Sequence, residues 1–516
     1  MAKALLHLGR SRPGSLAPWL STTAAGAVLP LAFAPWSWWW LAPFCVAVLF
    51  HNAWTASPGR AFALGYLFGL GLFGVGVSWI HVSMTQYGGG GPVTSFIATG
   101  GLIALLALFP ALALCLARGL RPQADAWALW ASLPAAWLAL EWLRTWLFTG
   151  FPWLLLGYSQ TDAPLAAALA PVTGVLGLSA VVTLLAAALV WCAAGRGWRR
   201  WAVTAIAVAA LGAATHAGLT RDWTRPAGPP LEVALVQGNF DQAEKWRPEN
   251  RSKTLARYAT LSEPLEQADL IVWPETAMPL LYANLPTAYL DKLTRRLDAA
   301  EATLILGAPT RGESGRIFNS AVAVGTSAAY AKRHLVPFGE YVPLRGLFGD
   351  LLDVLGAPES DFAPGAQATL LPVAEYRAAI AICYEIIFPS EVASLAAGSN
   401  FIVNMSNDAW FGDSIGPWQH LQIARMRAME TQRYVLRATN TGVTAVINDR
   451  GRVRAQAQQF EAVKLVSNLV PRTGLTPYLR WRDAPLLITI TVLLLFLTIR
   501  RGAGRPLRFT KKAVKR

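Results

Sequence analysis

Cysteine is scarce in this sequence, with only four in 516 residues. Cys45, Cys115 and Cys192 lie inside long apolar segments, and Cys383 is the only one in the long polar stretch of the chain. This scarcity excludes a disulfide within that stretch, because Cys383 has no partner there. Cys383 ends an apolar run where a strand would meet a loop, so it is a candidate nucleophile. The alternative is a small buried hydrophobe, which is what most free cysteines are.

Charge is also scarce: 15% of the residues are charged, 54% are hydrophobic and the mean hydropathy is +0.37. These values exclude an ordinary soluble protein. The 22 tryptophans, many near the ends of apolar runs, suit the aromatic belts of membrane proteins. The net charge of +15 would indicate nucleic-acid binding only if it lay on a soluble face. Much of it lies instead in short loops and in the tail Arg500–Arg516, so no nucleic acid is expected as a partner.

About seven apolar segments of spanning length are predicted in the first 220 residues, and an eighth at Pro485–Ile499. The seven lie near residues 15–34, 36–53, 61–82, 93–117, 127–149, 172–194 and 200–218. We therefore expect three parts: a membrane domain (1–220), a soluble domain (221–480), and a last span with a basic tail (481–516).

Loop charges predict the orientation of these spans. Basic residues lie before the first span and in alternate loops, at Lys3, Arg10, Arg12, Arg60, Arg118, Arg121, Arg196, Arg199 and Arg200. The connections Ala34–Trp40, His81–Pro92 and Phe151–Pro164 contain no Lys or Arg. The positive-inside rule then places both termini in the cytoplasm and the 221–480 domain on the opposite side, the periplasm of a bacterium. The N-terminus resembles a signal peptide, but Pro35 directly follows the Ala32–Ala34 triplet, so we expect an uncleaved first span.

The soluble part is predicted to be α/β, because short apolar runs alternate with amphipathic stretches. Strands are expected at Leu231–Gln237, Leu270–Trp273, Thr303–Gly307, Ser320–Val324, Ala379–Cys383, Phe401–Met405, Thr444–Ile447 and Lys464–Asn468. Helices are expected at Tyr282–Ala300 and Trp418–Arg437.

A thiol that attacks an ester or amide needs a base and a cation to hold the oxyanion. The soluble part offers only His334 and His420 as histidines, neither in a Cys-His signature nor at metal-ligand spacing. Glu275 follows an apolar strand and Pro274, at the strand end where α/β sheets place their sites. Lys332 follows another strand and is a natural oxyanion stabiliser. Alone, either residue would be an ordinary solvated loop residue.

Three motifs carry a resemblance to a known family. They are Trp273–Glu275, the Lys-x-His-Leu-Val-Pro-Phe-Gly-Glu run of Lys332–Glu340, and Ile382–Glu385. Their order, Glu, Lys, Cys, resembles the nitrilase (carbon–nitrogen hydrolase) superfamily, which implies an αββα sandwich. With the spans around them, the chain resembles the apolipoprotein N-acyltransferases. Further matches are Val236–Asn239, Lys245-Trp246, Ser406–Gly412, Gly416–His420, Thr439–Gly442 and Gly150–Trp153.

The resemblance implies a role for each matching residue. Glu275 would be the general base, Cys383 the nucleophile and Lys332 the group that stabilises the tetrahedral intermediate. Supporting or substrate-binding roles would fall to four residues: Glu340 as a second carboxylate, Tyr384 and Glu385 beside the nucleophile, and Trp246 in substrate binding or access.

The implied reaction has two stages. Cys383 would take the sn-1 acyl chain from a phospholipid as a thioester. The α-amino group of the diacylglyceryl-modified cysteine of an apolipoprotein would then attack it. The resemblance implies a bacterial inner-membrane enzyme with no cofactor and no metal, and we expect a monomer.

Other readings stay open. Glu141 and Arg144, three residues apart in the fifth span, could pair on one helix face with a functional or a structural role. Trp410 and Phe411 could contact an acyl chain, gate the cleft or pack in the core. One rival function is a membrane-tethered amidase, which would use the same triad with water as the second nucleophile. The other is a transporter with a periplasmic binding domain. The sequence shows no inverted repeat, which counts against the transporter.

Overall fold

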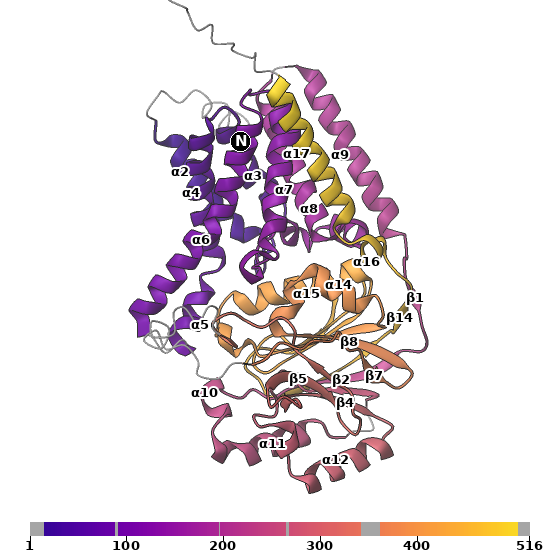
Figure 1. Cartoon of the computed structure of the whole chain (residues 1–516). Coiled ribbons are helices and arrows are strands. Elements are labelled where there is room, and N and C mark those ends of the chain that lie inside the picture. The colour runs from indigo at the N-terminus through magenta and orange to yellow at the C-terminus, as the bar shows by residue number, and fades with distance from the viewer. Residues whose placement is uncertain (1–14, 88–90, 196, 265–267, 342–361, 504–516) are drawn as a thin grey trace, which may run out of the picture.

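The structure is a computed structural model that describes residues 15–87, 91–195, 197–264, 268–341 and 362–503. Lys3, Arg10, Arg12, Arg196 and most of the basic tail lie outside the described residues. A bundle of apolar helices forms one end of the molecule and an α/β domain forms the other (Figure 1). The last helix returns to the bundle and packs against α7 (Leu133–Arg144).

Among the described residues, five helices are long and apolar enough to cross a membrane: α4 (Pro58–Gly76), α6 (Gly91–Leu120), α8 (Pro164–Ala193), α9 (Trp198–Leu219) and α17 (Ala484–Ala503). The first, second and fifth predicted segments form shorter helices: α2 (Ala17–Val28), α3 (Leu41–Trp54), and a π-helical turn (Ala128–Ser132) that continues into α7.

Glycine and proline explain where the helices depart from the expected spans. The predicted span 61–82 divides into α4 and α5 (Trp79–Tyr87), and Gly74 and Gly76 lower helix propensity just before the break. Helix α8 begins at Pro164, and the piece that follows its break agrees with the predicted sixth span, 172–194. Gly174, with φ of +63°, interrupts that helix and separates its two pieces.

The α/β domain contains two six-stranded mixed sheets, which confirms the α/β prediction. The first has the order β13-β2-β3-β4-β5-β6, with β2, β3 and β4 parallel. The second has the order β12-β11-β10-β9-β8-β7, with β8, β9 and β10 parallel. The strands of the first sheet are β2 (Leu231–Gln237), β3 (Leu270–Val272), β4 (Thr303–Arg311), β5 (Ile317–Ala323), β6 (Ala329–Ala331) and β13 (Val463–Leu469). Those of the second are β7 (Leu371–Val373), β8 (Tyr376–Ile382), β9 (Phe401–Ser406), β10 (Val435–Thr439), β11 (Ala445–Ile447) and β12 (Val453–Gln456).

Helices cover the outer face of each sheet. α11 (Arg251–Leu261) and α12 (Thr287–Ala299) lie at the end far from the bundle, where Tyr258, Leu293 and Leu297 join the core of the first sheet (Figure 1). α14 (Pro389–Ala396) and α15 (Gly416–Thr431) lie between the second sheet and the bundle (Figure 1). The chain passes between the bundle and the α/β domain twice. The two connecting segments pair there as the short antiparallel strands β1 (Arg225–Pro226) and β14 (Arg472–Thr473).

Two helix predictions need correction. Tyr282–Ala300 contains a 3-10 turn (Tyr282–Asn284) before α12 begins at Thr287. The second predicted helix, Trp418–Arg437, is wrong at its end, because α15 stops at Thr431 and Val435–Thr439 is the central strand β10. Gln432, with φ of +44°, turns the chain between them. β10 is buried throughout, so it lacks the alternating pattern that would have distinguished it from a buried helix.

Candidate active site

Glu275, Lys332 and Cys383 follow three strands of the two facing sheets. Glu275 lies just beyond β3, Lys332 directly follows β6, and Cys383 directly follows β8. All three are buried. Lys332 and Glu275 form an ion pair, and Cys383 lies within electrostatic reach of both. Because β3 and β8 belong to the parallel centres of their sheets, the site occupies the carboxyl-end position typical of α/β folds.

Donors from three directions fix the carboxylate of Glu275. Its Oε1 accepts hydrogen bonds from Lys332 Nζ at 3.2 Å and from Asn319 Nδ2 at 2.8 Å. Its Oε2 accepts the backbone N–H of Asn407 at 3.0 Å. These three donors give the carboxylate a defined orientation, which a general base needs.

Two carboxylates hold the ammonium of Lys332. Glu340 Oε2 lies 2.8 Å from Lys332 Nζ, and Glu275 Oε1 lies 3.2 Å away. Burial lowers the pKa of Lys332, but the two carboxylates more than offset this, so the pKa is raised. Asn319 Nδ2 donates to both Glu275 and Glu340, which closes the network. Lys332 is therefore a permanent cation near neutral pH.

Cys383 sits in a strained turn between β8 and a 3-10 helix (Cys383–Ile387). Its φ of +50° lies in the left-handed region, which costs free energy for a residue with a Cβ. Burial, and then the Glu275 carboxylate, raise the pKa of its thiol to about 12, with Lys332 acting in the opposite direction. The resting thiol is therefore protonated and requires a base to become a nucleophile.

Glu385 holds this strained turn. Its Oε2 accepts the N–H of Ile382 at 2.7 Å, and its Oε1 accepts Tyr330 Oη at 2.8 Å and the N–H of Arg333 at 2.7 Å. Ile382 directly precedes Cys383, and Arg333 directly follows Lys332. Glu385 therefore connects the Cys383 turn of one sheet to the segment of Lys332 beside the other sheet.

His420 supports the same turn from the helix side. Its Nε2 lies 3.2 Å from the carbonyl oxygen of Cys383, and its Nδ1 lies 3.1 Å from Arg437 Nη2. Its Nδ1 also lies 3.3 Å from Asp408 Oδ1. Burial, reinforced by Arg437, lowers the pKa of His420. Asp408 forms a buried ion pair with Arg437 at 2.6 Å, and the Arg437 charge holds the Asp408 pKa below its usual range despite burial.

The loop Gly150–Trp153 connects the helical bundle to this site. Tyr384, the residue after Cys383, donates its hydroxyl to the carbonyl of Gly150 at 2.9 Å. Trp153 Nε1 donates to Gln419 Oε1 of α15 at 2.7 Å. The bundle therefore contacts both the nucleophile turn and the helix that carries His420.

Phe411 belongs to an aromatic cluster at the same junction. Its ring centroid lies 4.6 Å from that of Trp79 and 6.1 Å from that of Trp153. Phe411 is buried, which favours the packing reading for this residue. The carbonyl of Trp410 accepts the hydroxyl of Ser83 from α5 at 2.6 Å.

The predicted pairing of Glu141 with Arg144 is wrong. The ion pairs of the described residues do not include one between them. Glu141 Oε1 instead accepts the N–H of Leu156 at 2.8 Å, and Arg144 donates to the carbonyls of Phe151 at 3.0 Å and of Trp153. Both charged side chains thus bind backbone of the connecting segment, which a sequence pattern in one helix does not reveal.

Trp246 directly follows the short helix α10 (Gln242–Lys245) and is 40% exposed. Its neighbour Lys245 is buried and reaches the residues of the Glu275 turn.

The sequence reasoning did not single out Lys245, Asn319, Asp408 or Arg437 for the site. It examined His420 only as a possible base or metal ligand. The described residues contain no group of three or more His, Cys, Asp or Glu side chains that could hold a metal ion.

Comparisons with known proteins identify both halves of the chain. Residues 25–188 match the apolipoprotein N-acyltransferase N-terminal domain, and residues 232–472 match the carbon–nitrogen hydrolase domain. The apolipoprotein N-acyltransferase of Methylococcus capsulatus is 44% identical over 90% of this chain and 93% of its own. The chain belongs to the apolipoprotein N-acyltransferase family. Another family member, from Pseudomonas aeruginosa (strain UCBPP-PA14), is 44% identical over 96% of this chain and 98% of its own. Membership confirms the resemblance seen in the sequence motifs.

Solved structures of nitrilase-superfamily proteins also align with part of the chain. The Nit3 protein of Saccharomyces cerevisiae covers 49% of this chain and 93% of its own, with 18% identity and a TM-score of 0.36. An amidase of Nesterenkonia covers 50% of this chain and 96% of its own, with 20% identity and a TM-score of 0.35.

Proposed function

We propose that this family member transfers a fatty acyl chain from a membrane phospholipid to the α-amino group of a diacylated apolipoprotein, through a thioester on Cys383. The observation that carries this proposal is the buried cluster of Glu275, Lys332 and Cys383, which the loop Gly150–Trp153 ties to a bundle of apolar helices. The activity of the family supplies the reaction class, and the cluster supplies the groups that this reaction requires.

The first stage forms the thioester. Glu275 takes the proton of the Cys383 thiol as the sulfur attacks the carbonyl carbon of the sn-1 ester. The oxyanion that forms is stabilised by the Lys332 ammonium, which is already in place and needs no reorganisation. When the intermediate collapses, the C–O bond breaks and Glu275 returns the proton to the leaving lysophospholipid.

The second stage forms the amide. The α-amine of the lipoprotein's modified cysteine attacks the thioester carbonyl, and Glu275 takes a proton from the attacking nitrogen. Collapse breaks the C–S bond, and the thiolate recovers the proton from Glu275. The high pKa of the Cys383 thiol makes the protonated form the resting state, so each cycle ends as it began.

The supporting residues divide between two tasks. Glu340 fixes the ammonium of Lys332, while Glu385 and Tyr384 hold the turn that presents the sulfur. The exposed Trp246 suits a role in substrate binding or access.

Membrane placement follows from the helices. We propose about eight spans, with the three shorter apolar helices crossing together with the five long ones. Both termini would face the cytoplasm of a bacterium, and the α/β domain would face the periplasm, where both lipid substrates are available. The enzyme would act as a monomer without a cofactor.

The proposal is tested with detergent-purified protein, a phospholipid labelled in its sn-1 chain, and a diacylated lipopeptide with a free N-terminal amine. We expect the label in an amide on the lipopeptide and little label released to water when the lipopeptide is omitted. Release at an equal rate without the amine would favour the amidase-type hydrolase instead. An N-acetylated lipopeptide is the matched control, because it lacks the attacking amine.

A further inference from the structure

The segment from Asp241 to Arg247 contains one buried residue, and that residue is a lysine. Its other side chains are exposed or partly exposed, whereas Lys245 is 1% exposed. Lysine is almost never fully buried without a charged partner. The burial of Lys245 therefore needs an explanation other than packing.

Lys245 reaches the turn that carries the general base. Its Nζ donates to Thr276 Oγ1 at 2.7 Å and to the backbone carbonyl of Glu275 at 3.3 Å. The ion pairs of the described residues do not include Lys245, so its charge faces only neutral oxygens at contact distance. Burial lowers the pKa of Lys245 to about 7, partly offset by the Glu275 carboxylate. Such a group costs free energy in the folded state.

A second contact leads from the same short helix to the other end of Glu275. Gln242 accepts a hydrogen bond from the side chain of Asn407, and the backbone N–H of Asn407 donates to Glu275 Oε2 at 3.0 Å. Helix α10 thus contacts the backbone of Glu275 through Lys245 and its carboxylate through Asn407. Thr276 has φ of +47°, so the turn that Lys245 binds is strained and needs external support.

We propose that Lys245 is a positioning residue: it holds the Glu275–Thr276 turn so that the carboxylate faces the Cys383 thiol. This inference rests on the proposed function and adds a residue to it. Lys245 acts through Glu275 and touches neither the acyl group nor the sulfur.

Substitution with methionine separates this role from a structural one. Methionine has a similar length and removes a desolvated ammonium, so Lys245→Met is expected to keep or raise the thermal unfolding midpoint. The rate of acyl-enzyme formation on Cys383 should nevertheless fall about 10- to 100-fold, because a misplaced base costs this much, while KM for phospholipid changes little. Lys245→Arg should restore part of the rate. Lys253→Met, at an exposed position of α11, is the matched control.

Three results would overturn the assignment. They are an unchanged rate in Lys245→Met, a rise in KM with an unchanged maximal rate, and a rate loss that follows a loss of thermal stability. If the unmodified enzyme itself forms no adduct on Cys383, the proposed function fails, and this outcome is distinct from a failure of the Lys245 assignment.

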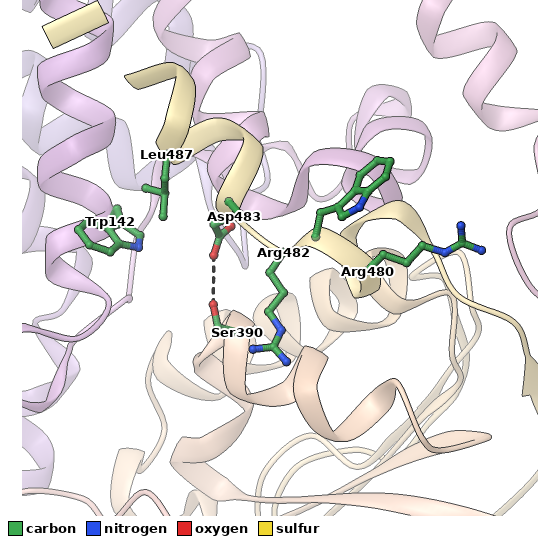
Figure 2. Close-up of a pocket in the computed structure, with 8 residues that line it drawn as sticks. Trp142, Ser390, Arg480, Arg482, Asp483 and Leu487 are labelled. Carbon is green, nitrogen blue, oxygen red and sulfur yellow. Dashed lines mark hydrogen bonds between the residues drawn. The ribbon is translucent and has the colours of Figure 1, made fainter. Parts of the chain in front are cut away.

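A hollow at the start of the last helix supports a second, independent inference. It has a volume of about 430 Å³ and lies where α16 (Pro477–Trp481) meets α17 (Figure 2). Its lining residues are Trp142, Ser390, Arg480, Trp481, Arg482, Asp483, Ala484 and Leu487. It contains none of the triad residues.

Two of the lining residues are exposed cations. The ion pairs of the described residues include neither Arg480 nor Arg482, and both side chains are exposed. The acidic neighbour Asp483 is buried and accepts the hydroxyl of Ser390 at 3.1 Å (Figure 2). The guanidinium groups therefore remain available to a ligand, and the local charge is net positive.

The hollow lies at the boundary of a membrane span. α17 begins at Ala484, and Trp481 just before it is 61% exposed, as expected of a tryptophan at a membrane–water interface. Basic hollows beside spanning helices bind lipid headgroups. We infer that this hollow binds the phosphate of a phospholipid through Arg480 and Arg482, with Trp142, Trp481 and Leu487 against its glycerol and upper acyl chain.

Native mass spectrometry of the full chain tests this inference, with every variant in a Cys383→Ala background to prevent turnover. Phosphatidylglycerol should remain bound more than diacylglycerol, and Arg480→Gln with Arg482→Gln should lower its retention about 10-fold, as expected for the loss of a charge-assisted hydrogen bond. Arg452→Gln with Arg454→Gln changes the charge equally at exposed positions in or beside the edge strand β12 and should have no effect. Equal retention in both double variants would overturn the site. If inorganic phosphate competes for the hollow as strongly as phosphatidylglycerol does, the hollow binds free phosphate and the lipid assignment is overturned.

Discussion

The buried Lys332 and the partly buried Glu340 form an ion pair of 2.8 Å, shorter than the 3.2 Å contact between Lys332 and Glu275. The closer carboxylate therefore belongs to the residue outside the triad. Glu340 also accepts the N–H of Val336, so its position is fixed by the chain that follows Lys332. In the proposed mechanism, Glu340 holds the ammonium of Lys332 and Glu275 takes the proton of the thiol.

Glu340→Gln removes that charge at nearly constant shape. Lys332 then loses one of the carboxylates that raise its pKa, so the pKa falls and the ammonium loses its proton at lower pH. We expect acyl-enzyme formation to slow about 10- to 100-fold, because the cation is no longer held in place. The alkaline limb of the pH–rate profile should move to lower pH. A slower rate with an unmoved alkaline limb would contradict the electrostatic role.

Glu275→Gln should change two properties of Cys383 in opposite directions. The Glu275 carboxylate raises the pKa of the thiol, so its removal lowers that pKa and increases the thiolate fraction near pH 8. Alkylation of Cys383 by iodoacetamide should therefore become faster. Acyl transfer should become slower by about 100-fold or more, because no base remains to take and return the proton. A decrease in both rates would show that Glu275 acts on the thiol through structure alone.

Much of the site could be predicted from the sequence, because its residues lie at the ends of strongly apolar strands. All eight predicted strands are present in the structure, and the first of them has the predicted bounds, Leu231–Gln237. Glu275 and Cys383 follow two of these strands within short motifs, so local pattern was sufficient to select them. The sequence predicts Lys332 after the strand Ser320–Val324, whereas it directly follows β6, a three-residue strand too short for its pattern to be detected.

The residues that sequence reasoning missed act through contacts between distant segments. Asn319 lies 44 positions from Glu275, and His420 lies 37 positions from the carbonyl that it binds. The pattern of apolar and polar residues within one strand or helix cannot predict contacts between segments this far apart in the sequence. Glu141 and Arg144 show the converse, because a correct helical spacing suggested a pair although both side chains bind the backbone of a loop.

Asp408→Asn should destabilise the fold as well as the site. It leaves the guanidinium of Arg437 buried without its counter-charge, and the loss of one partner of a buried pair costs about 3–5 kcal/mol. In the unmodified protein the Asp408 pKa is lowered, so its contribution is fully present above about pH 4 and is lost as the pH falls toward the folded-state pKa. Thermal unfolding in detergent should show this acid-dependent loss in the unmodified protein and less of it in the variant. Equal acid dependence in both would contradict the assignment.

Trp153→Phe tests the connection between the bundle and the α/β domain. It removes the donor to Gln419 while keeping most of the ring, so we expect a destabilisation of about 1 kcal/mol, measured by thermal unfolding. Trp198→Phe is the matched control, because Trp198 is 75% exposed at the start of α9. Equal effects of the two substitutions would argue against a specific contact at the junction.

The central claim is that Cys383 carries the acyl chain between the two substrates. The most direct measurement is to incubate purified protein with labelled phospholipid and to analyse the peptide that contains Cys383. We expect a hydroxylamine-sensitive acyl adduct on this residue, which disappears on addition of a lipopeptide amine and is absent from Cys383→Ala. Acyl transfer to the lipopeptide by Cys383→Ala at the normal rate would contradict the account.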